Sequence, residues 1–275
     1  MYAFPDISRD EVRRISRCSR VFGAVVRSAH GQVGHNKSDE LREDPPNLRG
    51  AFYAPRGRDN PKELVPHPQQ AKFFALGTQF IVIQNTCCQD LRFKTFYDLT
   101  GSGGKAGLAA VFFHKWSSVV SLESCRHTFD VAVMARRIVK RVEPPDMLTN
   151  AAAWRIEHTT FKMADWIDGD VVFFDGTVFE RLDEGVLCRY LQGRLRALQA
   201  GSFVILFTVC SDQLLTGDAF QLLYKKTVKH TGEGVVGDCF TTWLFKTTMH
   251  SSDYRVGVFE APITDRRLDQ LEDKC

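Results

Sequence analysis

The sequence predicts an α/β fold built on an open, mostly parallel sheet. From Phe93 onward, short β-prone runs alternate with longer segments whose apolar residues have helical spacing, which is the pattern of repeated βαβ units. One run, "SFVILFTV", is apolar throughout, as strands buried on both faces are. A glycine-rich turn follows the first strand of the series, and doubly wound sheets bind ligands at that position.

The expected elements follow in chain order. Strands are predicted at "FKTFYDL", "SSVVSLES", "AWRIEHTTF" and "GDVVFFDGTVF", and helices at "GKAGLAAVFFHKW" and "TFDVAVMARRIVKRV". The run "LDEGVLCRYLQGRLRALQ" is predicted as a helix closed by Gly201, at the place of a C-cap glycine. The runs "FTTWLFKTT" and "YRVGVFEAPI" are predicted as a final antiparallel pair.

The first 75 residues differ from the rest. An arginine-rich helix is predicted over "ISRDEVRRISRCSRVFGAVVRSAH", followed by a loop or extended arm rich in Pro, Gly and charge that begins at "GQVG". A further helix is predicted to begin near Pro68 and to run through "AKFFALGTQFIVIQN". We therefore divide the chain into a basic helical and loop segment, residues 1–75, and an α/β domain, residues 76–275.

Composition narrows the class of protein. With 275 residues, 44% apolar and 25% charged, the chain suits one large folded domain or a domain with an appendage. A net charge of +3 provides no global basic field for nucleic acid, although residues 1–75 hold 13 Lys and Arg against 9 Asp and Glu. The eight cysteines form no CxxC pair, which argues against a disulfide scaffold or a zinc site. Without a signal-peptide core or an apolar run of membrane-spanning length, we expect an intracellular soluble protein.

The stretch "FYDLTGSGGKAGLAA", residues 96–110, has three candidate ligands: a triphosphate, a dinucleotide and S-adenosyl-L-methionine. A P-loop needs GxxxxGK followed by Ser or Thr. Leu99 stands six residues before Lys105, and Ala106 follows the lysine, so the P-loop is excluded. A dinucleotide site would use a GxGxxA turn that begins at Gly101, with Glu123 for the ribose hydroxyls, and the spacing permits this.

Sites for S-adenosylmethionine also use a glycine turn, but an acid ends the first strand, near the α-amino group of the ligand. A second acid ends the next strand and accepts the ribose hydroxyls. Asp98 and Glu123 stand at these two ends. Two carboxylates without a cluster of phosphate-binding cations suit a ligand with a ribose, an ammonium and a sulfonium, so we favour this cofactor. The alternative without a ligand is an ordinary glycine turn capped by an aspartate.

Three segments together carry a family resemblance: "FYDLTGSGGKAGLAA", "VVSLES" and "FKMADWIDGDVVFFDGTVF". In order and spacing, the chain resembles the disruptor-of-telomeric-silencing family, the histone lysine methyltransferases without a SET domain, and is most similar to its short kinetoplastid members. The resemblance covers roughly residues 75–250. It implies a class I S-adenosylmethionine-dependent methyltransferase fold, Rossmann-like, with a mostly parallel seven-stranded sheet and residues 76–275 as catalytic domain. It also implies methylation of a lysine in the core of histone H3 within the nucleosome, and hence a nuclear protein.

The resemblance assigns the cofactor contacts. Asp98 falls on the acid of the family's DLGSGxG turn, at the methionine end of the cofactor, and Glu123 falls on the ribose-binding acid. The acid-aromatic pair that holds the adenine falls on Thr160 and Phe161. The residues expected to contact the cofactor are Thr78, Asp98, Thr100, Gly101, Gly103, Gly104, Lys105, Glu123, Ser124, Thr160, Phe161 and Asp175.

Three residues are expected at the methyl acceptor: Asp175, Thr177 and Trp243. The resemblance places "DGTVF" at the opening where the target lysine meets the methyl group, with Asp175 aligning the amine and Trp243 walling a lysine channel. Phe174 and Phe179 are further candidate walls, and core packing is the alternative for each aromatic. Methyl transfer from a sulfonium to an amine requires positioning and desolvation, with no metal or nucleophilic side chain. An apolar channel also lowers the pKa of the lysine.

Departures from the family keep other functions open. Thr100 stands at the family's first glycine unless Gly101 takes that part, Thr160 replaces an acid and Asp175 replaces an asparagine. "LGTQF", residues 76–80, is the nearest counterpart of a missing Tyr-Gly-Glu motif. The alternatives are a class I methyltransferase acting on another protein, RNA or a small molecule, an NAD-dependent oxidoreductase, and a degenerate cofactor-binding domain.

Two basic groups are candidate partner contacts. The N-terminal arginines would contact nucleosomal DNA or the acidic histone surface, or else form a solvated helix face: Arg13, Arg14, Arg17 and Arg20. A second patch near the edge of the site would contain Lys225, Lys226, Lys229 and Lys246, and scattered surface lysines are the alternative. No membrane partner and no metal is expected.

Overall fold

The computed structural model describes residues 9–35, 68–87, 90–142, 151–179, 191–208, 215, 217–229 and 239–248. Its helices are α1 (Arg9–His35), α3 (Pro68–Cys87), α4 (Lys105–Phe113) and α5 (Arg126–Val142), with 3₁₀ turns η1 (Leu91–Phe93), η2 (Ala151–Ala153) and η3 (Gly176–Phe179). Its strands are β1 (Thr95–Asp98), β2 (Ser118–Leu122), β3 (Trp154–Glu157), β4 (Val171–Asp175), β5 (Phe203–Thr208), β6 (Phe220–Lys229) and β7 (Cys239–Thr247).

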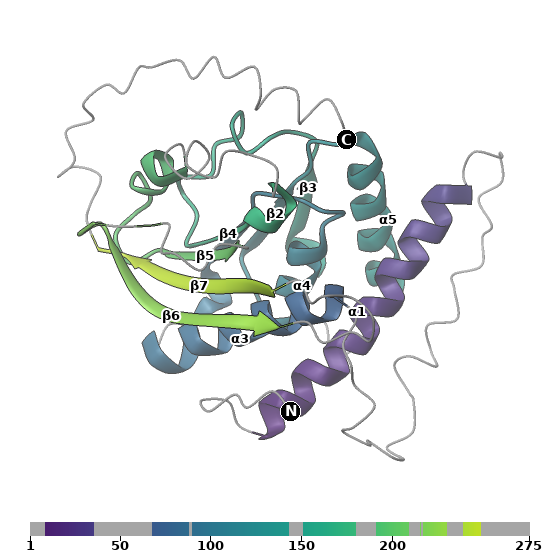
Figure 1. Cartoon of the computed structure of the whole chain (residues 1–275). Coiled ribbons are helices and arrows are strands. Elements are labelled where there is room, and N and C mark those ends of the chain that lie inside the picture. Colours follow the sequence, from purple (N-terminus) through teal and green to yellow (C-terminus); the bar gives the residue numbers. More distant parts are fainter. Residues whose placement is uncertain are drawn as a thin grey trace.

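One sheet of seven strands organises the molecule, in the order β3-β2-β1-β4-β5-β7-β6 (Figure 1). The first five strands of this order are parallel, and β7 runs antiparallel to both β5 and β6. A dinucleotide-binding Rossmann sheet has the order 3-2-1-4-5-6, whereas here an antiparallel strand is inserted between the fifth and sixth. This arrangement is the class I S-adenosylmethionine-dependent methyltransferase fold, and it confirms the predicted fold class.

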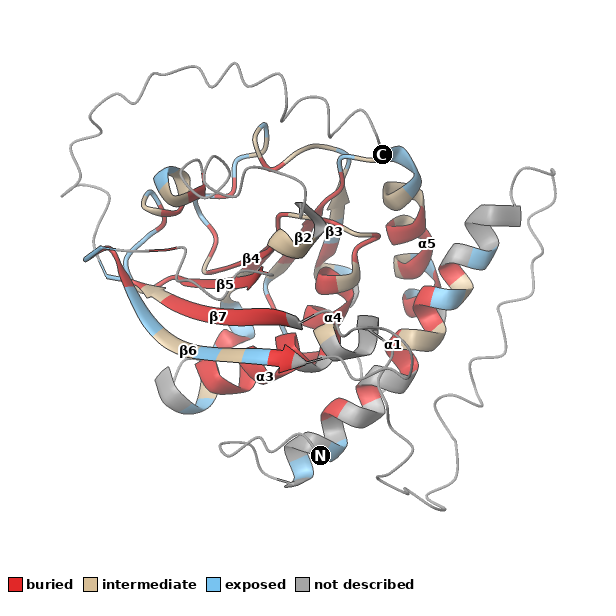
Figure 2. Ribbon diagram, viewed as in Figure 1, coloured by how far each residue is buried: buried red, intermediate tan, exposed pale blue. Residues whose placement is uncertain are grey.

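The sheet separates two apolar cores, because successive strand residues point to opposite faces. On one face, Phe96 and Phe173 pack with α1, α3, α4 and α5, and on the other, Tyr97 packs with the segment between β4 and β5. The burial of the central strands is visible in Figure 2. Asp98 and Asp175 continue the alternation of Phe96 and Phe173, so their side chains leave the sheet on the face that the four helices cover.

Helices α1 and α3 share the apolar core of the sheet. The buried side chains Val21 and Val25 of α1 belong to it, and α1 lies beside α5 and α3 (Figure 1). Helix α3 is continuous, so the predicted boundary between residues 75 and 76 falls inside a helix. Helix α1 continues through Gly31, where a loop was expected. Within the described ranges, no helix has the length and apolar character needed to cross a membrane.

The C-terminal antiparallel pair differs from the prediction. Strand β7 contains all but the last residue of the predicted run "FTTWLFKTT". Its outer partner is β6, a strand that was not predicted because its exposed edge is rich in polar residues. The run "YRVGVFEAPI" lies outside the described residues. The predicted helix cap at Gly201 is also wrong. In the described part of the predicted helix, residues 191–195 are helical and the helix ends there, before Gly201. The Gly201 N–H instead donates to the Thr247 carbonyl oxygen, at 2.8 Å.

Candidate active site

Three carboxylates gather at the carboxyl edge of the sheet, where β1, β2 and β4 end. Asp98 is the last residue of β1, Glu123 follows β2 directly, and Asp175 is the last residue of β4. Their exposed fractions are 0%, 1% and 6%. Burial of a carboxylate costs free energy unless partners compensate for it. This edge is therefore organised around charge, in contrast to the apolar strands behind it.

The turn between β1 and α4 is left-handed over four successive residues. The φ angle is 69° at Gly101, 69° at Ser102, 75° at Gly103 and 68° at Gly104. Ser102 is the one non-glycine residue with positive φ in the described ranges, and this conformation costs an L-residue about 1–2 kcal/mol. At Gly101, a Cβ atom would lie 2.6 Å from the Leu122 carbonyl oxygen. The turn requires glycine there because it passes directly against the end of β2.

One carboxylate oxygen of Asp98 accepts hydrogen bonds, and the other is buried without a hydrogen-bond partner among the described residues. Its Oδ1 accepts the backbone N–H of Thr100 at 3.3 Å and that of Gly101 at 3.2 Å. Its Oδ2 has no hydrogen-bond partner among the described residues. Burial raises the pKa of Asp98 well above its usual range and the charge of Glu123 raises it further, while the backbone amides of Thr100, Gly101 and Gly107 lower it. A bound ammonium group would satisfy Oδ2 and favour the ionised form.

Glu123 is folded onto the glycine turn. Its Oε1 accepts the N–H of Gly104 at 2.5 Å, and its backbone N–H donates to the Glu157 carbonyl oxygen at 2.9 Å. Burial raises the pKa of Glu123, while hydrogen bonds from the Thr128 hydroxyl and from the amides of Gly104 and Gly103 lower it. Glu123 thus joins the end of β2 to the N-terminus of α4, beside any ligand that lies on the turn.

Thr100 connects the ends of β1 and β4. Its Oγ1 accepts the backbone N–H of Asp175 at 3.1 Å and lies 3.5 Å from Asp98 Oδ1, to which it donates. A glycine at this position would have no hydroxyl for the bridge. The left-handed turn begins at Gly101, one residue later.

A lysine that sequence analysis missed completes the cluster at β4. Lys72 of α3 places its Nζ 2.7 Å from Asp175 Oδ2 and 2.5 Å from Thr177 Oγ1. Thr177 also donates its hydroxyl to Asp175 Oδ1 at 2.5 Å and its N–H at 3.1 Å. Lys72 precedes Asp175 by 103 residues and lies in no recognisable motif, so no signal in the sequence joins the two.

Lys105 brings a second cation to this edge. It opens α4 directly after the glycine turn. Burial lowers the pKa of Lys105, the charge of Lys72 lowers it further, and the charges of Glu123 and Asp175 raise it. The two lysines therefore share one electrostatic environment with the carboxylates. Within the described ranges, no group of three or more His, Cys, Asp or Glu side chains is placed to hold a metal ion.

The predicted adenine pair lies in the loop between β3 and β4. The Phe161 ring packs edge-on against Phe174, with 5.6 Å between centroids. Thr160 Oγ1 is buried without a hydrogen-bond partner among the described residues. The Phe161 carbonyl accepts from Trp166 Nε1 at 2.7 Å and from Arg194 at 3.3 Å, which fixes the loop. The loop thus contains a buried hydroxyl without a partner at the position where the sequence resemblance predicts an adenine contact.

Two further predicted cofactor contacts are Ser124 and Thr78. Ser124 is exposed, one residue beyond Glu123. Thr78 is buried in α3, and it is the adjacent Gln79 that α3 directs to the sheet, where its Nε2 donates to Thr242 Oγ1 at 3.0 Å.

The prediction that Trp243 walls a channel beside Asp175 needs correction. Trp243 pairs in register with Leu206, on the sheet face opposite to the Asp175 side chain. It is buried in the apolar core of that face, its Nε1 donates to Thr208 Oγ1 at 3.2 Å, and Lys225 Nζ lies 4.2 Å from its ring centroid. The physical reason is strand register, because it determines the sheet face on which the Trp243 side chain lies. The side chain of Phe179 is not among those described.

Comparison with known proteins gives a likeness of fold. No protein-family model matches the chain, and no curated protein matches it. Three similar solved structures are a SAM-dependent methyltransferase from Methanosarcina mazei (11% identity over 58% of this chain and 94% of that one, TM-score 0.43), TrmN from Thermus thermophilus (16%, 62% and 48%, 0.43) and the tRNA methyltransferase TrmK from B. subtilis (14%, 62% and 68%, 0.39). At such scores they decide nothing about ligand or substrate, and the fold assignment rests on the strand order.

Proposed function

We propose that this chain is an S-adenosylmethionine-dependent methyltransferase whose acceptor is the amine of a lysine side chain. The observation that carries the proposal is the buried, unpartnered Oδ2 of Asp98 beside the glycine turn. An α-ammonium group would give that oxygen both a cation and a hydrogen-bond donor. Glu123 would accept ribose hydroxyls, and Thr160 and Phe161 would border the adenine.

The same residues suit a dinucleotide poorly. A pyrophosphate on this turn would lie among the carboxylates of Asp98 and Glu123, and like charges disfavour one another in a buried site. The antiparallel β7 also departs from the Rossmann strand order. An NAD-dependent oxidoreductase is therefore the weaker hypothesis.

An amine acceptor is supported by the pair of Asp175 and Thr177. Their side-chain oxygens already hold a primary ammonium, that of Lys72, at 2.7 and 2.5 Å. The bound cofactor would supply a methyl group activated by the sulfonium charge. The chain would contribute position and desolvation, and neither Asp175 nor Thr177 would act as a nucleophile.

The acceptor that we propose is a lysine in the core of histone H3 within the nucleosome, in the nucleus. The support for this choice is the sequence resemblance given above. Contacts to nucleosomal DNA through the N-terminal arginines belong to the same proposal. Arg13 is exposed on α1, with its guanidinium 3.1 Å from Asp10 Oδ1.

RNA is the second candidate acceptor, and a different observation favours it. Asp175, Phe207, Thr242 and Lys226 are successive register partners across β4, β5, β7 and β6. Lys226 and the exposed Lys225 therefore lie on the outermost strand at the same edge as Asp175. Cations in such a position would attract a phosphate backbone.

Calorimetric titration tests the cofactor. We expect S-adenosylhomocysteine to bind, NAD not to bind, and Glu123→Ala to abolish the binding. Binding of NAD alone would refute the proposal. Transfer of label from radiolabelled S-adenosylmethionine to nucleosomes, free histone H3 and tRNA then ranks the acceptors. Label on histone H3 is the expected result, and label on tRNA alone would replace it with the RNA alternative.

A further inference from the structure

We propose that Lys72 is a methyl acceptor within this chain, so that the enzyme methylates its own Nζ atom. The inference rests on the proposed function. Lys72 Nζ is held by Asp175 Oδ2 at 2.7 Å and by Thr177 Oγ1 at 2.5 Å, the oxygens assigned above to the substrate amine. An incoming lysine would need the position that Lys72 already occupies.

The docking of α3 fixes Lys72 at this position. Lys72 and Gln79 are seven residues apart and so lie on one face of the helix, about 10.5 Å apart along its axis. Gln79 donates to Thr242 of β7, and Thr242 is joined through Phe207 of β5 to Asp175 of β4. Two strand spacings amount to about 9.6 Å, which matches this separation, so the contacts of Gln79 with β7 and of Lys72 with the end of β4 are made by one face of α3.

The Lys72 amine also lies close to the glycine turn. The backbone N–H of Asp175 donates to Thr100 Oγ1, and that hydroxyl is bonded in turn to Asp98. Lys105, the first residue after the turn, lies within electrostatic range of Lys72. Strand β1, which ends in Asp98, lies next to β4, which ends in Asp175, so a methyl donor with its ammonium on Asp98 would lie beside the Lys72 amine.

The reaction requires the neutral amine. Lys72 would lose one proton to solvent, to which 35% of its side chain is exposed. A sulfonium cation bound beside it would favour this loss, because like charges disfavour the ammonium form. The Nζ lone pair would then form a bond to the methyl carbon while the carbon–sulfur bond breaks. The electron pair of that bond stays on sulfur, and S-adenosylhomocysteine is the leaving group.

The chain contains a matched control. Lys94 Nζ lies 2.8 Å from Asp170 Oδ1, with side-chain exposures of 38% and 30%, against 35% and 8% for Lys72 and Asp175. Lys94 immediately precedes β1 and Asp170 immediately precedes β4, so this pair lies at the amino edge of the sheet. The two lysines match in chemistry and exposure and differ in their position relative to the glycine turn.

The experiment is peptide mass spectrometry of the full chain after incubation with S-adenosylmethionine, on the wild type, Lys72→Arg and Lys94→Arg. We expect methyl groups at Lys72 in the wild type and in Lys94→Arg, none in Lys72→Arg, and a rate constant independent of protein concentration. As a readout without turnover, the labelling of Lys72 by an acylating reagent should change when S-adenosylhomocysteine is added, and that of Lys94 should not.

Calorimetry with S-adenosylhomocysteine separates the possible failures. If the ligand binds and Lys72 remains unmethylated, the inference is overturned and the proposed cofactor stands. If the ligand does not bind, both the proposed cofactor and the methylation of Lys72 are refuted. A rate constant that rises with protein concentration, or equal methylation of Lys94, would overturn the intramolecular reaction.

Discussion

The two edges of the sheet carry the same kind of ion pair in different surroundings. At the amino edge, Asp170 pairs with Lys94 and also accepts the Thr95 N–H on Oδ2 at 2.8 Å. Its backbone N–H donates to the Thr95 carbonyl, and its carbonyl accepts the Phe203 N–H. The polar groups of Asp170 are thus used to join β1, β4 and β5.

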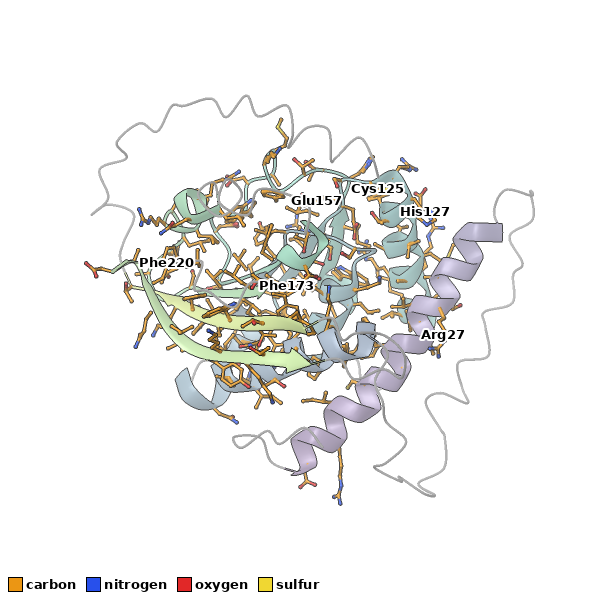
Figure 3. The ribbon with its side chains drawn as sticks, in the orientation of Figure 1. Arg27, Cys125, His127, Glu157, Phe173 and Phe220 are labelled. Carbon is orange, nitrogen blue, oxygen red and sulfur yellow. The ribbon has the colours of Figure 1, made fainter. Side chains whose placement is uncertain are left out.

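At the carboxyl edge, buried polar atoms remain without partners. Asp98 Oδ2 and Thr160 Oγ1 lack hydrogen bonds among the described residues. In Figure 3, Cys125 and Glu157 mark this edge near β2 and β3, and Phe220 marks the opposite one. Most buried polar groups in native proteins are paired. The two edges differ in hydrogen bonding. An ion pair whose aspartate makes hydrogen bonds with all its polar groups supports the fold, whereas an ion pair surrounded by buried polar atoms without hydrogen-bond partners indicates a ligand site.

The largest expected effect on the free energy of unfolding comes from a glycine-to-alanine substitution, and each edge of the sheet offers one glycine for the comparison. Gly101 and Gly201 both have positive φ, but a Cβ on Gly101 would collide with the Leu122 carbonyl, whereas a Cβ on Gly201 meets no atom within 4 Å. Gly101→Ala should lower the free energy of unfolding by about 2–5 kcal/mol. Gly201→Ala should cost about 1–2 kcal/mol. Urea denaturation measures both, and equal losses would contradict the close approach of the turn to β2.

A second comparison removes the charge of one aspartate at each edge. Asp98→Asn should weaken S-adenosylhomocysteine binding about 10- to 100-fold, the value of a hydrogen bond to a charged group. It should leave the melting temperature unchanged or raise it, because a neutral amide replaces a buried carboxyl group whose ionisation burial disfavours. Asp170→Asn should leave affinity unchanged. Calorimetry and thermal denaturation test the two variants, and a loss of stability without a loss of affinity in Asp98→Asn would mean a purely structural role.

The raised pKa values predict how ligand affinity depends on pH. Burial raises the pKa of Asp98 and Glu123, so each binds a proton more readily in the free protein than in the unfolded chain. An ammonium ligand requires ionised Asp98, and binding must release a proton below the raised pKa. Affinity should therefore rise up to about tenfold per pH unit for each released proton, and level off above that pKa.

The stability of the free protein should move in the opposite direction. A carboxyl whose folded pKa lies above its unfolded value contributes stability below the unfolded value, and this contribution disappears as pH rises through the folded value. Calorimetry in buffers of different ionisation enthalpy measures the released protons. Binding without proton release at any pH would show that Asp98 is already ionised in the free protein.

The sequence predicted those parts of the site that local signals define. The alternation that ends in Asp98 and Asp175, and the glycine turn after the first strand, are properties of short segments, and the structure has both. Lys72 could not be predicted, because helical periodicity identifies the residues that share a face and not the strands that the helix crosses. The prediction for Trp243 was wrong for a related reason. The sheet face on which its side chain lies depends on strand register, which is set by pairing between distant segments.

Thr100 provides a smaller test at the carboxyl edge. Thr100→Val preserves shape and removes the hydroxyl that accepts the Asp175 N–H. We expect a loss of about 1 kcal/mol in the free energy of unfolding, the usual net value of one hydrogen bond. Thr100→Ser, which keeps the hydroxyl, is the control. If valine and serine behave alike, the bridge between β1 and β4 contributes nothing.

The last comparison concerns the two lysines themselves. Lys94 and Asp170 are both partly exposed, so Lys94→Met should change the free energy of unfolding by about 1 kcal/mol or less, whereas Lys72→Met leaves the buried Asp175 carboxylate without its cation and should cost about 1–3 kcal/mol. Their kinetics should differ. Without Lys72, the oxygens of Asp175 and Thr177 are open to an external amine, so the KM for a protein-lysine substrate should fall several-fold. Lys94→Met should leave KM unchanged. An unchanged KM in both variants would show that a substrate lysine does not bind where the Lys72 amine lies.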